Sequence, residues 1–284
     1  MATREEEPPP PARAPAPEYL TVTSGLPRPR AVGLDAPWRW LREGWKDFRA
    51  ATGASLFYGV VLAGMGAILT QVWGRGAIEI ALVTGFLLVG PFLLMGLYDV
   101  SRRLGRGERA MVVDTMTAWR ANIAAIGFYA VILALLLAVW IRVSIVVVAL
   151  FFPDGVPSGA ALAAQLAGSP DGLAFVAAYL AAGLGFALFV FATSVVSLPM
   201  LLDRPGMDAL SAMIASFNVL RANFAPMLLW AAIIVALTAL GFATFYVGLV
   251  VALPVIGHAT WHAYRDTVGE QLPPDSSAAA GARR

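Results

Sequence analysis

The sequence contains apolar stretches that are too long and too free of charge to fold in water. The longest, residues 224–257, runs for 34 residues without a charged side chain. A helix rises about 1.5 Å per residue, so about 20 apolar residues cross a hydrocarbon core about 30 Å thick. Hydrophobic residues make up 59% of the chain and charged residues 13%, against roughly 45–50% and 25% in soluble domains. These features predict an all-α membrane protein that crosses a bilayer several times.

Six membrane-spanning helices account for the apolar runs. The longest run holds two short crossings if the chain turns near residues 241–248. The sequence leaves open whether residues 224–264 form those two spans or one long helix. The predicted spans cover residues 54–73, 77–98, 123–143, 178–202, 224–243 and 246–264.

Two segments outside the spans have the composition of disordered tails. Residues 1–37 hold nine of the nineteen prolines, and residues 269–284 consist mainly of small and polar residues. Neither segment has enough apolar surface to bury on folding. The sequence therefore predicts a six-helix transmembrane domain at 38–268 between two disordered tails.

Positive charge gives the expected orientation, because basic residues beside spans are retained in the cytoplasm. With six spans, eighteen of the twenty Lys and Arg residues fall on the side of the two termini. Arg75 and Arg142 fall on the other side. Both termini are therefore expected to be cytoplasmic.

One phrase recurs at the start of the odd-numbered spans. "WRANIAAIGFY" at 119–129 matches "LRANFAPMLLW" at 220–230, and a weaker copy, "FRAATGASLFY", stands at 48–58. Apolar residues at helical spacing precede each copy, which predicts a short amphipathic helix at the membrane surface. The chain is therefore expected to form three repeated units, each an amphipathic interfacial helix plus two spans. The second span of each unit carries one proline: Pro91, Pro199 and Pro254.

Several residues of the repeat are candidate functional or lipid-facing residues. Asn122 and Asn223 stand where the chain turns from the membrane surface into a span, and Asn is a favoured N-cap. The prolines are compatible with broken helices around a transport site. The arginines of the three copies are expected to reach lipid phosphates: Arg49, Arg120 and Arg221. Seating the bundle in the bilayer is the favoured role for these elements.

The middle unit is longer than the other two. Its repeat Arg and Pro are 79 residues apart, against 42 and 33 residues in the other units. Arg142 is a charge within a continuous apolar run, so it is a candidate functional residue or snorkels to the outer headgroups. The extension at 143–171 is predicted to form either a re-entrant or interfacial cap or the ends of two long tilted helices.

His258 and His262 lie one helical turn apart near the cytoplasmic end of the last span. Two imidazoles on one face can contribute to a metal site, although the sequence shows no further ligands. Beside Trp261 and Tyr264 they also fit an interfacial belt, which is the favoured interpretation. No catalytic residue and no cofactor is predicted. The chain has no cysteine, and its net charge of +2 gives no sign of nucleic-acid binding.

Four stretches of the sequence carry a family resemblance: "SLFYG", "LLVGPFLLMGLYDVSRRLGRGE", "VVSLPMLLDR" and "GFATFYVGLVVALPVIGHATWHAYRD". Over roughly residues 38–268 the chain resembles the bacterial integral membrane family catalogued as domain of unknown function 2189. The resemblance implies the inner membrane of a Gram-negative bacterium and carries over no catalytic residue. Some members are labelled cytochrome c oxidase subunit I, but such a core needs histidines on several helices, and here both stand on one.

Three functions follow as hypotheses. The favoured one is a non-enzymatic scaffold or binding protein that sits in the lipid bilayer and associates with a membrane-protein partner or with itself. The alternative is a transporter or permease component for an apolar or weakly polar substrate, with a cavity between the proline-bearing helices. A haem- or metal-linked respiratory subunit is a distant third.

Overall fold

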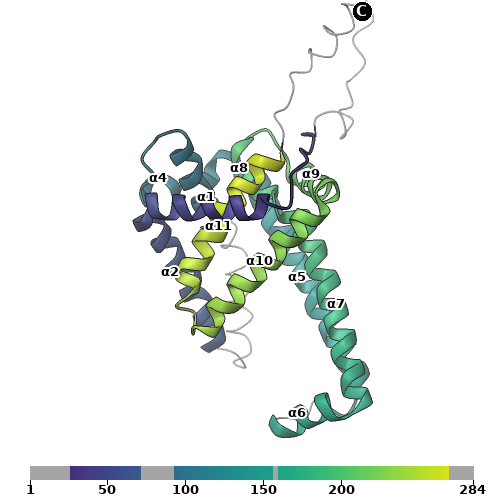
Figure 1. Ribbon diagram of the computed structural model, residues 1–284. Helices are drawn as coiled ribbons and strands as arrows, with labels where there is room; N and C mark the ends of the chain where they lie inside the picture. Colours follow the sequence, from purple (N-terminus) through teal and green to yellow (C-terminus); the bar gives the residue numbers. More distant parts are fainter. Residues whose placement is uncertain (1–25, 72–92, 156–158, 269–284) are drawn as a thin grey trace, which may run out of the picture.

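The computed structural model describes residues 26–71, 93–155 and 159–268 of the 284-residue chain. The regular elements in these ranges are helices (Figure 1). They are α1 (Ala36–Ala50), α2 (Thr52–Gln71), α4 (Val112–Thr115), the 3-10 helix η1 (Ala118–Asn122), α5 (Ile123–Phe151), α6 (Gly159–Gly168), α7 (Pro170–Ser194), α8 (Ser197–Asp203), α9 (Ala209–Ala222), α10 (Phe224–Ala243) and α11 (Leu249–Thr267). A further helical stretch covers residues 93–105.

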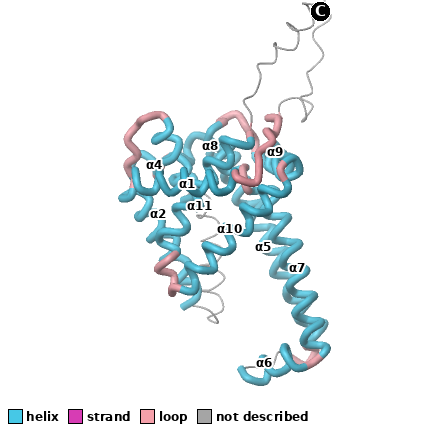
Figure 2. The backbone as a smooth tube through the Cα atoms, viewed as in Figure 1, coloured by secondary structure: helices cyan, strands magenta, loops and turns pink. Residues whose placement is uncertain are grey.

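The helices are arranged around one end of the molecule, which we call the platform. The platform consists of α1, α4, η1, α8 and α9, and the other long helices extend away from it (Figures 1 and 2). The helices α5 and α7 run side by side and reach further than α2, α10 and α11. The short helix α6 lies crosswise at their far tip.

The helices agree with an all-α membrane protein. The described residues hold three candidate spans, or four if one bent pair counts, so the six predicted spans are not confirmed. Three helical segments are long and apolar enough to cross a membrane: Val112–Phe151, Pro170–Asp203 and Phe224–Ala243. The helices α1 and α2 make a fourth if they count together, although the chain bends by 105° between them. Most of the predicted span 77–98 lies outside the described residues.

The predicted span 246–264 corresponds to α11, which packs mainly against the platform helix α1. Glycine allows the close approach, because a Cβ on Gly44 would lie 2.6 Å from the backbone nitrogen of Ala259. Trp261 and Tyr264 of α11 are also buried, and the Tyr264 hydroxyl donates to Asp203 of α8. The interfacial belt predicted for these two aromatic residues is therefore wrong, because protein covers them.

Residues 224–264 form two helices rather than one. The helix α10 has the predicted bounds, and a tight turn with positive φ at Phe245 (52°) and Tyr246 (68°) separates it from α11. The hydroxyl of Thr244 accepts a hydrogen bond from the Gly248 N–H at 2.9 Å, which closes the turn. This turn lies where the sequence predicted one.

The predicted outer extension consists of two long helices and the short helix α6. The helix α5 has 29 residues, which makes it about 44 Å long, and it continues nine residues beyond Arg142. Aromatic contacts hold it to α7, including Trp140 and Tyr179 with ring centroids 5.6 Å apart. The two long helices agree with one predicted alternative, and the interfacial or re-entrant position of α6 stays a prediction.

The three repeat prolines fall in different settings. Pro199 is the third residue of α8, and the break between α7 and α8 lies at residues 195–196. Proline causes such a break because its ring clashes with the carbonyl four residues earlier, here that of Val195. Pro254 lies inside α11. Pro91 lies outside the described residues.

Each of the helices α2, α5 and α10 follows a platform element. The helix α1 precedes α2, α9 precedes α10, and a broken pair, α4 and η1, takes the place of the helix expected before α5. Residues at matching positions share their environment. When the three copies of the phrase are aligned, Ala51, Asn122 and Asn223 are equivalent positions. Seven residues after each of them an aromatic side chain is buried: Tyr58, Tyr129 and Trp230.

Part of the segment predicted to be a tail packs against the platform. The backbone N–H of Arg30 donates to the carbonyl of Thr267 at 2.7 Å, and Pro29 forms an isolated antiparallel bridge with Val268. Residues 29 and 30 are therefore part of the fold.

Candidate functional site

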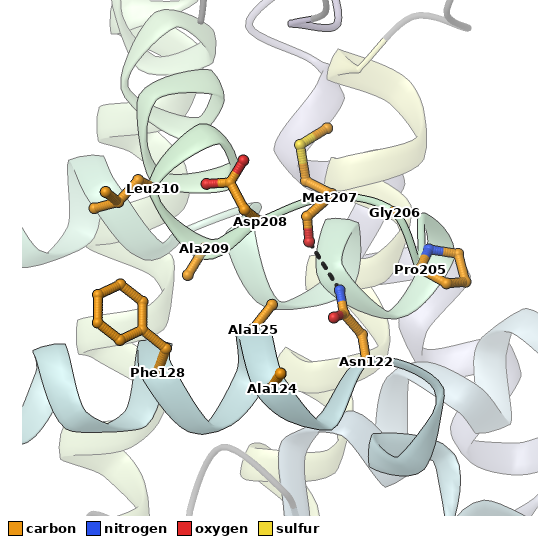
Figure 3. Close-up of a pocket in the computed structure, with 10 residues that line it drawn as sticks. All are labelled: Asn122, Ala124, Ala125, Phe128, Pro205, Gly206, Met207, Asp208, Ala209 and Leu210. Atoms are coloured by element: carbon orange, nitrogen blue, oxygen red, sulfur yellow. Dashed lines mark hydrogen bonds between the residues drawn. The ribbon is translucent and has the colours of Figure 1, made fainter. Parts of the chain in front are cut away.

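An open groove lies where α5 leaves the platform (Figure 3). Its volume is about 510 Å³. One wall is the first turns of α5, and the other is the α8–α9 turn with the start of α9. Ten residues line it: Asn122, Ala124, Ala125, Phe128, Pro205, Gly206, Met207, Asp208, Ala209 and Leu210.

Asn122 joins the two walls of this groove. Its side-chain Nδ2 donates to the carbonyl of Met207 at 2.9 Å, shown as a dashed line in Figure 3, and to the carbonyl of Leu201 at 3.3 Å. Asn122 occupies the N-cap position of α5 but makes no side-chain cap bond. The predicted position is correct and the predicted capping role is wrong, because the amide hydrogens serve carbonyls of another segment.

Asn223 has the same kind of role at the start of α10. Its Nδ2 donates to the carbonyl of Arg30 at 2.9 Å, and its Oδ1 accepts from the Val32 N–H at 2.8 Å. It makes no side-chain cap bond to α10. Both repeat asparagines therefore bind the segment that leads into a platform helix, α9 for Asn122 and α1 for Asn223.

Asp208 is the charged residue of the groove. Its carboxylate accepts the Ser211 backbone N–H at 2.9 Å and so caps α9. Hydrogen bonds from the Ser211 hydroxyl and backbone N–H lower the pKa of the Asp208 carboxyl below its ordinary value. The side chain is exposed, so it presents a negative charge at the rim of the groove.

His258 is buried between three helical segments. Its Nε2 lies 2.9 Å from the Ser55 hydroxyl of α2, and its Nδ1 lies 2.8 Å from the Ser101 hydroxyl in the 93–105 stretch. Ser55 donates its hydrogen to the carbonyl of Ala51, so it accepts from the ring. This pattern favours a ring with its proton on Nε2, in which case Ser101 donates to Nδ1.

His262, one turn further along α11, has a different partner. Its Nε2 lies 2.8 Å from the Asp47 carboxylate of α1. Three of the four ring nitrogens of the two histidines are thus engaged by protein side chains. Among the described residues no group of three or more His, Asp or Glu side chains is arranged to hold a metal ion. The metal site stays a hypothesis, which the metal content of the protein purified with and without both histidines tests.

Carboxylates that the sequence reasoning missed join the platform to α11. Asp203 of α8 accepts from the Tyr264 hydroxyl at 2.8 Å, and Asp266 accepts from the Trp40 indole at 3.0 Å and from Arg39 at 2.9 Å. The hydrogen bond from Arg39 to Asp266 raises the pKa of its guanidinium. Local sequence carries no signal for these pairs, since their members are 61 to 227 residues apart.

Comparison with known proteins bears on the membrane assignment. Residues 79–203 match the model of a family described as a predicted integral membrane protein, domain of unknown function 2189. This match supports the family resemblance of the sequence. Neither a curated protein nor a solved structure matches the chain. The match covers the central part of the stretch in which the sequence resembled the family.

The match to an integral membrane family places the protein in a lipid bilayer, where the repeat arginines were expected to reach lipid phosphates. Arg49, Arg120 and Arg221 are exposed at the ends of α1, η1 and α9. The guanidinium of Arg120 lies 5.5 Å from the Trp119 ring, and that of Arg221 lies 6.0 Å from the Phe217 ring. Arg142 is exposed within α5. Lipid contact by these residues is still an expectation.

Proposed function

We propose that the chain is a non-enzymatic scaffold or binding protein of a bacterial inner membrane, and that its α5–α7 hairpin binds another membrane-embedded chain. The observation that carries this proposal is the exposure of the hairpin. The apolar window of each of its two span-length segments is 0% buried. Large apolar side chains stand exposed along its length, including Leu135, Leu150, Leu180 and Leu184.

The buried ionisable groups of α11 and of the 93–105 stretch support a structural rather than a chemical role. His258 and Asp99 are buried, yet each is engaged: His258 by two serines, and Asp99 by Arg102 and by Arg103 at 2.9 Å. Groups bonded in this way stabilise the fold. The groove opens at the platform rather than between spans, so it gives the transporter alternative no specific support.

We also infer three related units of an in-plane element and two spans. Matching positions support this arrangement, because Trp45, Met116 and Phe217, six residues before the aligned Ala51, Asn122 and Asn223, are all exposed apolar side chains. They stand next to the repeat arginines, as expected of helices lying at a headgroup boundary. The second span of the first unit lies mostly outside the described residues.

The proposed orientation places the platform and both termini in the cytoplasm. Its support is charge, since the platform and its flanking turns carry most of the basic residues of the described part. The chain has no cysteine, so a single-cysteine variant has one thiol that a maleimide can label. In intact cells, a membrane-impermeant maleimide is expected to label Asp154→Cys, in the turn after α5, but not Lys46→Cys on α1. Labelling of Lys46→Cys without permeabilisation contradicts the orientation.

Site-directed crosslinking tests the binding role of the hairpin. Leu135 on α5, Leu184 on α7 and Leu240 on α10 are each 62% exposed. Each leucine is replaced in turn by cysteine and coupled to a photoreactive maleimide in native membranes. Discrete protein adducts are expected from positions 135 and 184, with Leu240→Cys as the matched control on another lipid-exposed helix.

The adducts also identify the kind of partner. If the protein purified into lipid nanodiscs gives an adduct of twice its mass, the partner is a second copy. If the adduct forms only in native membranes, the partner is another protein. Lipid adducts alone at positions 135 and 184, as at position 240, reject the proposed function.

A further inference from the structure

The groove between α5 and α9 continues the lipid-exposed surface of the protein. Its walls include Phe128 and Leu210, which are 52% and 53% exposed. Phe128 is followed along α5 by exposed Val131, and Leu210 is followed along α9 by exposed Ile214. An acyl chain lying along α5 can therefore enter the groove without leaving an apolar surface.

The polar part of the groove offers hydrogen-bond acceptors and negative charge. Nδ2 of Asn122 already donates to two backbone carbonyls, so Oδ1 is the polar atom that this side chain has left for a ligand. Figure 3 shows the Asp208 carboxylate at the rim, on the side of α9 and away from the α5 wall. None of the ten lining residues is cationic. The groove is thus complementary to a ligand with an apolar body and a cationic, hydrogen-bond-donating end.

We propose that this groove binds a phospholipid with a primary amine headgroup, such as phosphatidylethanolamine. The ammonium lies beside Asp208 at the rim, and one acyl chain lies between Phe128 and Leu210. A primary ammonium has three N–H donors for these acceptors. The quaternary ammonium of phosphatidylcholine has none, and the anionic headgroup of phosphatidylglycerol is repelled by the carboxylate.

This inference does not depend on the proposed protein partner of the hairpin. It requires only that the platform lies at the membrane surface, where α5 enters the bilayer. The two proposals can therefore fail separately, because one is tested by crosslinking from the hairpin and the other by the lipid selectivity of the purified chain.

Native mass spectrometry of the detergent-purified full-length protein tests the proposal. The protein is titrated with phosphatidylethanolamine, phosphatidylcholine or phosphatidylglycerol carrying identical acyl chains. The wild type is expected to bind the first lipid more tightly by roughly 1.5-fold to fivefold, the range for one partly exposed ion pair. Asp208→Asn is expected to abolish this preference while keeping the α9 cap, because Asn and Asp are equally good N-caps.

Asp35→Asn is the matched control, since Asp35 is an exposed carboxylate at the N-cap position of α1 and does not line the groove. It is expected to keep the preference. Equal binding of the three lipids by the wild type overturns the proposal without reference to any variant. A preference that persists in Asp208→Asn, or that disappears equally in Asp35→Asn, also overturns it, because the selectivity then does not come from this groove.

Discussion

Gly59 of α2 lies directly against the backbone carbonyl oxygen of Val250 in α11. A Cβ built on Gly59 would lie 2.0 Å from that oxygen. Pro254 lies four residues after Val250 and has no N–H, so this carbonyl lacks its usual helical donor. The proline that marks the repeat thus exposes a carbonyl, and the glycine lets α2 approach it closely enough for a weak Cα–H contact.

Replacing Gly59 with Ala is expected to force α2 and α11 apart. The added methyl meets backbone, which cannot rotate away, so the loss of stability should be about 1–3 kcal/mol. Gly64→Ala on the same helix is the control, because a Cβ there meets nothing within 4 Å. Thermal unfolding in detergent measures both variants. A Gly59→Ala protein as stable as Gly64→Ala contradicts this helix contact.

The sequence predicted those elements whose cause is local. The helix α10 was predicted with its observed bounds, because its apolar run is flanked by Asn223 and by the turn after residue 243. The positions of α1 and α9 were predicted because each carries an apolar face at helical spacing. The family and the membrane setting were likewise predicted, since both depend on composition and on whole phrases of sequence.

The sequence did not predict which surface covers an apolar or polar residue. Trp261 and Tyr264 have the composition of a membrane belt, yet both are buried within the protein. The partners of His258 lie 203 and 157 residues away in sequence. Asn122 stands at an N-cap position, but its amide binds a distant segment. Each error concerns a tertiary contact, which residue spacing along one helix does not encode.

Ser101→Ala is expected to leave Nδ1 of buried His258 without its donor. An unsatisfied buried acceptor costs about 1–3 kcal/mol, so the unfolding temperature should fall. Ser144→Ala, which removes a 3.3 Å contact to Tyr179 in the hairpin, should have a smaller effect. Nitrogen-15 NMR of the histidine rings checks the assignment directly. A His258 ring that carries its proton on Nδ1 contradicts the proposed donor pattern.

Asn122→Asp tests whether the amide hydrogens hold the groove walls together. The substitution keeps the size of the side chain but turns both donors into acceptors that face the carbonyls of Leu201 and Met207. The expected loss of stability is about 1–3 kcal/mol. Asn218→Asp, on the partly exposed side of α9, is the control and should change little. Equal unfolding temperatures for the two variants reject the bridging role.

The α9 cap should make stability depend on pH in the acid range. Because the Ser211 hydrogen bonds lower the pKa of Asp208 in the folded state, the ionised carboxylate stabilises the fold. This stabilising contribution is complete above the ordinary carboxyl pKa of 3.8. It is lost as the pH falls through the lower pKa of the folded state.

The neutral amide of Asp208→Asn caps α9 without titrating. The difference in unfolding temperature between wild type and Asp208→Asn should therefore be constant at neutral pH and should change below about pH 4, to the disadvantage of the wild type. A difference that stays constant throughout the acid range shows that the carboxylate is not selectively stabilised by the fold.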